Sequence, residues 1–311
     1  MGFFFLFNVI FYCKKKLMKK ILVLILTFFI FTAANADELK NVLNKVYDKG
    51  SKSAETYISN FLDGPGETEV SITTKNENKP TGSIMVVRPY SIDENSLTFY
   101  QAQLNSFALF GDTRQSLNYG VGKRFLSDDK TNFWGINSFI DYDTKANARG
   151  SIGYELKFSA FEATANYYMG ITGDNAVGDT TERILEGQEF KLAGQVPYAP
   201  WANINYTNYT WGKELNSDDS QGKVYSGEVF LSNNLTLEFG YDDNNISDSM
   251  DYARLTYVYS GKERPTVADG LSTEAFKNSD VSEDMLTKVK RSNIITLEVE
   301  TSGVVISNGN S

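Results

Sequence analysis

The sequence has 311 residues, a net charge of −9, no histidine and a single cysteine, Cys13. Without histidine there can be no Ser-His-Asp triad, no Cys-His pair and no histidine-based metal site. Catalysis by carboxylates alone remains an alternative, but we predict that the protein is not an enzyme and has no catalytic residue, no metal and no cofactor. The acidic charge, without a basic patch, argues against nucleic acid as a partner.

The first 36 residues differ in composition from the rest. A lysine-rich stretch that ends at Lys20 precedes the apolar run Ile21–Phe31, and Ala34-Asn35-Ala36 has the pattern of a cleavage site. We predict a secretory signal peptide over residues 1–36, with Met18 as an alternative initiator. The alternative is a membrane anchor, but the run is about half of the ~20 residues that a spanning helix needs. Cleavage would leave 275 residues without cysteine, and the loss of five lysines would change the net charge from −9 to −14.

Helical spacing follows the signal peptide. Between Asp37 and Leu62 apolar residues recur at three- and four-residue intervals, as in Leu39, Val42 and Leu43. The sequence Asp-Gly-Pro-Gly at 63–66 then ends helix formation. We therefore predict a periplasmic N-terminal helical segment over residues 37–66.

From residue 67 to residue 260 the apolar period changes to two, which indicates β-strands. Most runs are longer than the ~5–6 residues of globular strands and are close to the ~9–11 that cross a bilayer at a tilt. We predict twelve strands, at 67–74, 82–90, 97–109, 113–126, 131–143, 148–158, 160–170, 186–196, 201–211, 223–231, 234–242 and 251–260.

The connections between these strands alternate in length. Those after even-numbered strands are short, whereas several after odd-numbered strands are long and polar, such as residues 171–185 and 212–222. Outer-membrane barrels have this asymmetry, with short periplasmic turns and longer outer loops. The alternative, a soluble β-sandwich or barrel with its apolar face inward, has no reason to sort its loops in this way. We therefore predict an all-β fold, a twelve-stranded antiparallel transmembrane β-barrel over residues 67–260.

The alternation assigns side chains to two faces of the barrel wall, one toward lipid and one toward a wet lumen. We predict lumen-facing positions at Glu155, Lys157, Glu189, Lys191 and Glu238. We predict lipid-facing positions at Ile152, Tyr154, Leu156, Phe158, Leu235, Leu237 and Phe239. In this register Leu156→Arg impairs assembly by about 2–4 kcal/mol, and Glu155→Gln is nearly neutral.

Several segments carry a family resemblance. They are LTFYQAQL (97–104), LNYGVGKRFLSDD (117–129), WGINSFIDYDT (134–144), RGSIGYELKF (149–158) and FEATANYYMGITG (161–173). These segments resemble the β-domain of inverse autotransporters, the intimin/invasin family. SIMVVRPYSID (83–93) and RSNIITLEVE (291–300) are similar to family segments that flank the barrel.

The resemblance implies a twelve-stranded outer-membrane barrel, followed by a linker that returns through the pore, partly as a helix, toward a surface passenger. The linker and a short extended tail would occupy residues 261–311, with 271–291 as the pore helix and 293–300 as the emerging strand. The alternative is a solvated periplasmic tail. The last strand, 251–260, resembles the signal that the barrel-assembly machinery reads, carried by Leu255, Tyr257 and Tyr259; the alternative is one more amphipathic strand.

After Ser260 there are 51 residues, fewer than the ~100 of one immunoglobulin-like module, so we expect the passenger to be absent or truncated. We predict an outer-membrane translocator or anchor of the inverse autotransporter type. The alternatives are a small, plugged porin-like channel and the product of a split adhesin gene. Expected partners are outer-membrane lipid, the barrel-assembly machinery and periplasmic chaperones. We expect a monomer, exported by a cleaved signal peptide to the outer membrane of a Gram-negative bacterium.

Overall fold

The computed structural model describes residues 64–75, 80–213, 218–245, 249–260, 262–276, 279–301 and 304–307. The predicted signal peptide and residues 37–63 of the predicted N-terminal helical segment lie outside these described residues. Within the described part of the chain, no helix is long and apolar enough to cross a membrane. The regular structure there consists of β-strands and two short 3₁₀ helices.

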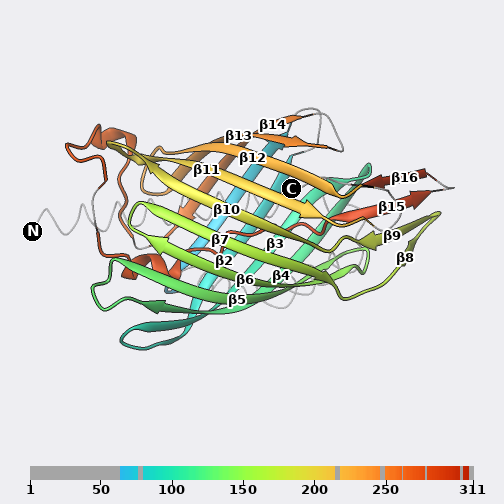
Figure 1. The fold of residues 1–311 in the computed structure, drawn as a ribbon, viewed down its shortest axis with the longest axis horizontal. Helices are drawn as coiled ribbons and strands as arrows, with labels where there is room; N and C mark the ends of the chain where they lie inside the picture. Colours follow the sequence, from blue (N-terminus) through green and yellow to red (C-terminus); the bar gives the residue numbers. More distant parts are fainter. Residues whose placement is uncertain are drawn as a thin grey trace, which may run out of the picture. The chain divides into compact units, whose positions relative to one another are not determined.

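Twelve antiparallel strands form a closed barrel (Figure 1). The first strand pairs with the last, from Thr68↔Tyr259 to Lys75↔Tyr252, and this pairing closes the sheet. Because closure leaves no free strand edge, the backbone polar groups are satisfied within the wall, as a lipid environment requires. The strands are β1 (Glu67–Lys75), β2 (Thr81–Ile92), β3 (Ser96–Leu109), β4 (Asp112–Leu126), β5 (Asn132–Asp143), β6 (Ala148–Phe158), β7 (Phe161–Gly170), β10 (Gly187–Val196), β11 (Ala199–Trp211), β12 (Ser220–Phe230), β13 (Leu235–Asn244) and β14 (Met250–Tyr259).

The predicted fold class and all twelve predicted strands are confirmed, and the strand ends agree to within three residues. Strand β5 shows why the prediction succeeds. Trp134, Ile136 and Ile140 are exposed on the outer face, whereas Asn137 and Asp141 are buried inside. Side-chain alternation is a property of the extended backbone itself. It can therefore be read before the partners of a strand are known.

The connections differ between the two ends of the barrel. At one end they are short and join β2 to β3, β4 to β5, β6 to β7, β10 to β11 and β12 to β13. At the other end the connection between β7 and β10 carries a hairpin, β8 (Asn175–Val177) and β9 (Thr180–Ile184). Outer-membrane barrels place short turns in the periplasm and long loops outside. We call these two ends the turn end and the loop end.

A second, four-stranded sheet lies at the loop end, with the order β16-β15-β9-β8 (Figure 1). Strand β15 (Leu297–Thr301) pairs antiparallel with β9, from Leu297↔Ile184 to Glu300↔Thr181. Strand β16 (Val304–Ser307) continues the sheet on the other side of β15. The predicted emerging strand at 293–300 therefore exists, although it begins at Leu297.

The predicted pore helix over residues 271–291 is wrong. Among the described residues of this stretch there is one five-residue 3₁₀ helix, η2 (Ser282–Leu286), after an earlier one, η1 (Val267–Asp269). The reason is that barrel side chains bond to backbone groups that a helix would use internally. Arg124 donates to the carbonyls of Met285 and Thr287, at 2.7 Å each. The chain is held by the wall instead of by i→i−4 bonds.

Candidate functional site: the occupied lumen

After β14 the chain passes along the turn end and then enters the barrel. Arg264 donates through Nη2 to the carbonyl of Ser232 in the β12–β13 turn, at 3.1 Å. The N–H of Val281 donates to the carbonyl of Lys130 in the β4–β5 turn, at 2.9 Å. Residues 281–296, which we call the luminal segment, then run inside the barrel to β15 at the loop end (Figure 1). The chain therefore crosses the barrel from its turn end to its loop end.

The luminal segment enters through an apolar cluster. Val281, Met285 and Val289 are buried against wall side chains from four strands, namely Met85, Val87, Leu97, Phe99, Leu126, Phe133 and Phe139. Full burial of a side chain of this size stabilises by about 1.5–3 kcal/mol. This part of the lumen is therefore packed like a hydrophobic core, whereas the sequence pattern predicts a water-filled lumen.

Glu155, predicted to face the lumen, lies inside the barrel and is buried. Both of its carboxylate oxygens accept from Arg124, at 2.8 Å each, and the Arg124 guanidinium lies 4.4 Å from the centroid of the Phe99 ring. Glu155 thus orients the arginine that binds the backbone of the entering chain. Its loss would leave a buried guanidinium without its counter-charge. The expectation that Glu155→Gln is nearly neutral does not fit this geometry.

A buried charge cluster lies at the centre of the lumen. Arg291 of the luminal segment forms a bidentate pair with Asp141, with Nη1–Oδ1 at 2.9 Å and Nη2–Oδ2 at 2.7 Å. Arg149 donates to the same carboxylate through Nε, at 2.9 Å, and through Nη2 to the carbonyl of Ser292, at 2.8 Å. The side chains of Asp141, Arg149 and Arg291 are all 0% exposed. Charges buried to this degree persist only when paired, so the cluster fixes the position of Arg291 in the barrel.

Glu189 binds the luminal segment beside this cluster. The N–H of Ser292 donates to Glu189 Oε1 and to the hydroxyl oxygen of Tyr168, at 2.8 Å each, and that hydroxyl in turn donates to Glu189. Asn166 donates to Glu189 Oε1 at 3.0 Å, and Lys191 Nζ pairs with Glu189 Oε2 at 3.1 Å. The predicted lumen-facing residues Glu189 and Lys191 are thus inside and adjacent.

The other two predicted lumen-facing residues also lie inside the wall. Lys157 pairs with Glu162 at 3.2 Å, and Glu162 also binds Lys290 of the luminal segment at 3.0 Å. Glu238 accepts instead from Arg254 of the neighbouring strand, at 3.1 Å. Placement inside the barrel agrees with the predicted face. The predicted lumen-facing residues nevertheless differ in whether they contact the luminal segment.

At the loop end an ion pair anchors the β8–β9 hairpin to the barrel rim. Arg114 of β4 pairs with both oxygens of Glu182 of β9, one of them at 2.9 Å, and both side chains are buried. Asn147 donates to Glu182 at 2.7 Å and to Asp143 at 3.0 Å. Buried charge-assisted bonds of this kind are strong and directional. They hold β9 in place as the partner strand of β15.

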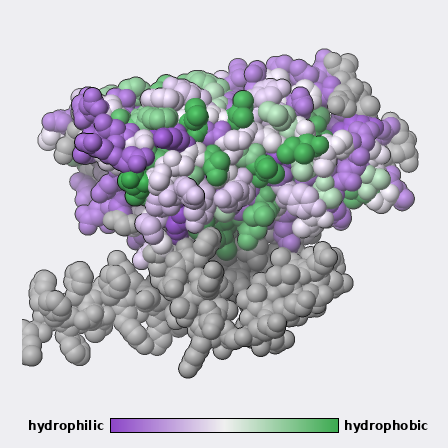
Figure 2. All heavy atoms as spheres, turned by 90° about the horizontal axis from the view of Figure 1, so that it is seen from below, coloured by the Kyte–Doolittle hydropathy of each residue, from purple (hydrophilic) through white to green (hydrophobic). Residues whose placement is uncertain are grey.

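The outer surface carries the predicted lipid-facing residues. Ile152 and Phe239 are 56% and 59% exposed, Tyr154 and Phe158 are exposed, and Leu156, Leu235 and Leu237 are half-buried. Leu255, Tyr257 and Tyr259 of β14 alternate with inward-facing Arg254 and Thr256 and therefore also point outward. Figure 2 shows apolar side chains across the middle of one face, with polar side chains toward both ends. This distribution suits a wall that crosses a bilayer.

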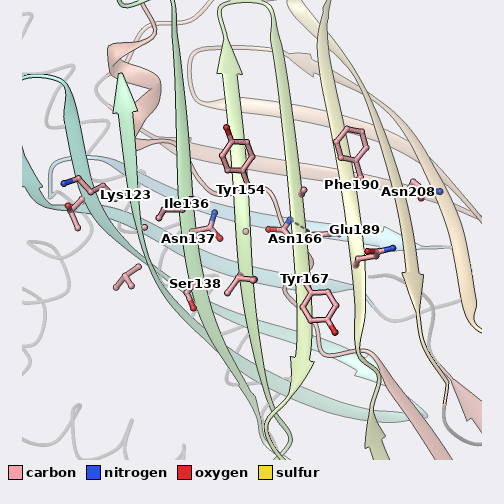
Figure 3. A pocket seen from close by; sticks show the side chains of 17 residues that line it. Lys123, Ile136, Asn137, Ser138, Tyr154, Asn166, Tyr167, Glu189, Phe190 and Asn208 are labelled. Carbon is pink, nitrogen blue, oxygen red and sulfur yellow. Dashed lines mark hydrogen bonds between the residues drawn. The ribbon is translucent and has the colours of Figure 1, made fainter. Parts of the chain in front are cut away.

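Figure 3 shows part of this wall, where a hollow of about 970 Å³ lies across strands β3–β7, β10 and β11. Tyr154, Tyr167 and Phe190 come from three adjacent strands and are exposed outward. Between them lie Asn166 and Glu189, joined by their hydrogen bond on the luminal side. One strand pair thus presents aromatic side chains to lipid and polar side chains to the luminal segment.

The inverse autotransporter β-domain family model matches residues 29–229. The chain belongs to the inverse autotransporter β-domain family. A solved structure described as "Unveiling the Mechanism Behind the in-meso Crystallization of Membrane Proteins" has a TM-score of 0.61 and 20% identity, covers 76% of this chain and 99% of its own, and shares the fold.

More distant barrels are also similar in outline. They include an outer membrane channel from Pseudomonas putida F1, with 8% identity, a TM-score of 0.47 and coverage of 63% of this chain and 96% of its own. Outer membrane phospholipase A from Escherichia coli has 7% identity, a TM-score of 0.42 and coverage of 64% and 99%. No curated protein matches the sequence.

Family and fold together establish the setting of this inverse autotransporter barrel. It lies in the outer membrane, surrounded by lipid, and acts as an outer-membrane translocator or anchor. Arg291 of the luminal segment and three of the wall residues that bind this segment, Asp141, Arg149 and Tyr168, were not singled out from the sequence. The alternation of side chains along each strand predicts which of them face inward. No signal in the sequence predicts which inward side chains contact one another.

Proposed function

We propose that this inverse autotransporter barrel carries its own C-terminal segment through the pore and holds it there, with the chain beyond β15 at the cell surface. One observation supports this proposal above the others. The luminal segment is bonded to the wall in the middle of the lumen and joins β9 at the loop end. A tail left in the periplasm would have no reason to meet an outer loop. The barrel thus serves as both conduit and anchor for the chain that follows.

We further propose the route by which the barrel reaches the membrane. A signal peptide ending at Ala36 is cleaved, chaperones carry the unfolded chain across the periplasm, and the barrel-assembly machinery reads β14 through Leu255, Tyr257 and Tyr259. The outward, apolar and aromatic face of this last strand supports that reading. The N-terminal mass of the mature protein tests the cleavage. Reduced membrane insertion of a Tyr257→Ser variant tests the signal on β14.

A tag placed after Ser311 tests the proposed threading. Intact Gram-negative cells that express the tagged protein are treated with a protease that cannot cross the outer membrane. We expect the tag to be removed, while a periplasmic marker protein survives. A tag that survives until the outer membrane is opened places residues after 260 in the periplasm and rejects the proposal.

We also propose that the barrel has no catalytic role. The lumen contains no histidine, and its buried charges are bonded to one another and to the luminal segment. Lipase and protease assays on the purified protein test this. The porin-like alternative fits less well, because the family match favours a translocator and the luminal segment occupies the pore.

A further inference from the structure

We propose that a water-filled path for small inorganic ions stays open beside the luminal segment, along β1 and β11–β14. A cavity of about 210 Å³ lies there inside the barrel. One water needs ~10–15 Å³ of such volume, so the cavity holds on the order of ten or more waters. Most of the residues that line it are polar, among them Thr73, Asn205, Glu228, Glu238 and Arg254, and its apolar members are Leu192, Ala193, Val289 and Ile294. This path is a property of the docked state, separate from the export of the chain.

The cavity exists because the luminal segment is seated to one side. Most hydrogen bonds and ion pairs that residues 285–293 make with the wall go to β3–β7 and β10. Lys288 alone reaches across, to Glu69 of β1 at 2.5 Å. None of the bonds that these described residues make reaches β11–β14. The cavity therefore lies between the luminal segment and one inward side chain of each of those four strands, Asn205, Glu228, Glu238 and Arg254.

Exposure of the charged side chains separates a dry side of the lumen from a wet one. On the seated side Asp141, Arg149 and Arg291 are 0% exposed. On the cavity side Arg254 is 33% exposed and Lys288 34% exposed. Their partners Glu238 and Glu69 are 14% and 7% exposed, so it is the cation of each pair that stays in contact with water. Hydrated charges along a polar wall are what a small ion needs in order to pass.

The cavity is also extended along the barrel axis. The inward residues of β1 from Glu69 to Lys75 all line it. At ~3.3 Å per residue these positions span about 20 Å of strand, which at the ~35–45° tilt of such strands covers about 15 Å of the ~25 Å height of the apolar band. Lys75 and Thr81 lie at the loop end of β1 and β2, and Glu228 lies near the turn end of β12. The lining thus extends over most of the barrel height.

Single-channel recording on the full-length barrel in planar bilayers tests the path. We expect a small, steady conductance that falls about twofold or more in an Asn205→Trp variant, because Asn205 of β11 lines the cavity. The matched control is Asn208→Trp, on the same strand but on the outer face, which should leave the conductance unchanged. A full-length barrel that passes no current, while a variant without residues 281–296 conducts, overturns the proposal.

Thiol labelling gives an independent readout that does not depend on current. In a Cys13→Ser background, a small charged thiol reagent should modify an Asn205→Cys variant rapidly. It should modify a Ser151→Cys variant at least about tenfold more slowly, because Ser151 is buried behind Arg291. Equal rates for the two variants contradict a wet side and a dry side. The tag experiment reports threading alone, so failure of the ion path and failure of export are distinguishable.

Discussion

The charge cluster around Asp141 predicts the largest single effect on docking of the luminal segment. Asp141→Asn keeps the shape of the side chain but removes the carboxylate that Arg149 and Arg291 share. Arg291 would retain Asn293 Oδ1 at 3.0 Å and Ser151 Oγ at 3.2 Å, neither of them charged. Two fully buried guanidinium groups would then lie close together without the carboxylate that bonds to both.

Removing one partner of a buried ion pair costs about 3–5 kcal/mol, because a charge is left uncompensated. Undocking hydrates Arg291, so the cost falls on the docked state and should appear as easier opening. At 1.4 kcal/mol per factor of ten, the opening equilibrium rises about 100- to 4,000-fold.

Hydrogen–deuterium exchange measures that equilibrium at the segment itself. The N–H of Val289 donates to Gln101, and the N–H of Ser292 donates to Glu189, so both exchange only when the segment opens. We expect their exchange in Asp141→Asn to accelerate by the factor above. Glu238→Gln, the same change on the wet side, should alter it by less than about tenfold. Unchanged exchange in Asp141→Asn refutes the role given to the cluster.

Three further predictions concern other parts of the barrel. Ile152→Arg places a charge on the lipid face near mid-height and should destabilise the barrel by about 2–4 kcal/mol. Urea unfolding in lipid vesicles measures this change, and an unchanged free energy of unfolding means that the assigned register is wrong. Glu182→Gln removes the charge on β9 that pairs with Arg114 at the loop end and leaves Arg114 with Asp143 of β5. The β8–β9 hairpin should become at least about tenfold more sensitive to protease on intact cells, whereas equal sensitivity argues against the anchor. Deletion of residues 281–296 should raise the single-channel conductance several-fold, since it empties the pore; an unchanged conductance means that the segment does not occupy the pore.

The strands were predictable because their signal is local. Alternation of side chains follows from the extended backbone, so the inward faces of Glu155, Glu189 and Glu238 could be assigned strand by strand. The partner of each residue is not local. Glu155 meets Arg124 across 31 residues and Glu189 meets Ser292 across 103. Such pairs depend on barrel closure and on the path of the C-terminal segment.

The two misjudged segments failed for the same physical reason. The family resemblance implied a helix over residues 271–291, yet barrel side chains take the backbone groups of Met285 and Thr287. Residues 171–185 read as a polar loop, yet they contain β8 and β9, and β15 arrives from the far end of the chain to pair with β9. In both segments a distant partner overrides the local propensity.

The central claim is that the C-terminal segment crosses its own barrel and docks on the loop end. A disulfide between β9 and β15 tests it most directly. Thr181 and Glu300 are opposite each other in the register, where Cα atoms lie ~4.5–5.5 Å apart, within the range of a disulfide. With Cys13 replaced by serine, the Thr181→Cys/Glu300→Cys variant should cross-link in intact cells, and Thr181→Cys/Leu271→Cys, with Leu271 at the turn end, should not. No cross-link in the first variant, or one in the second, would contradict the account.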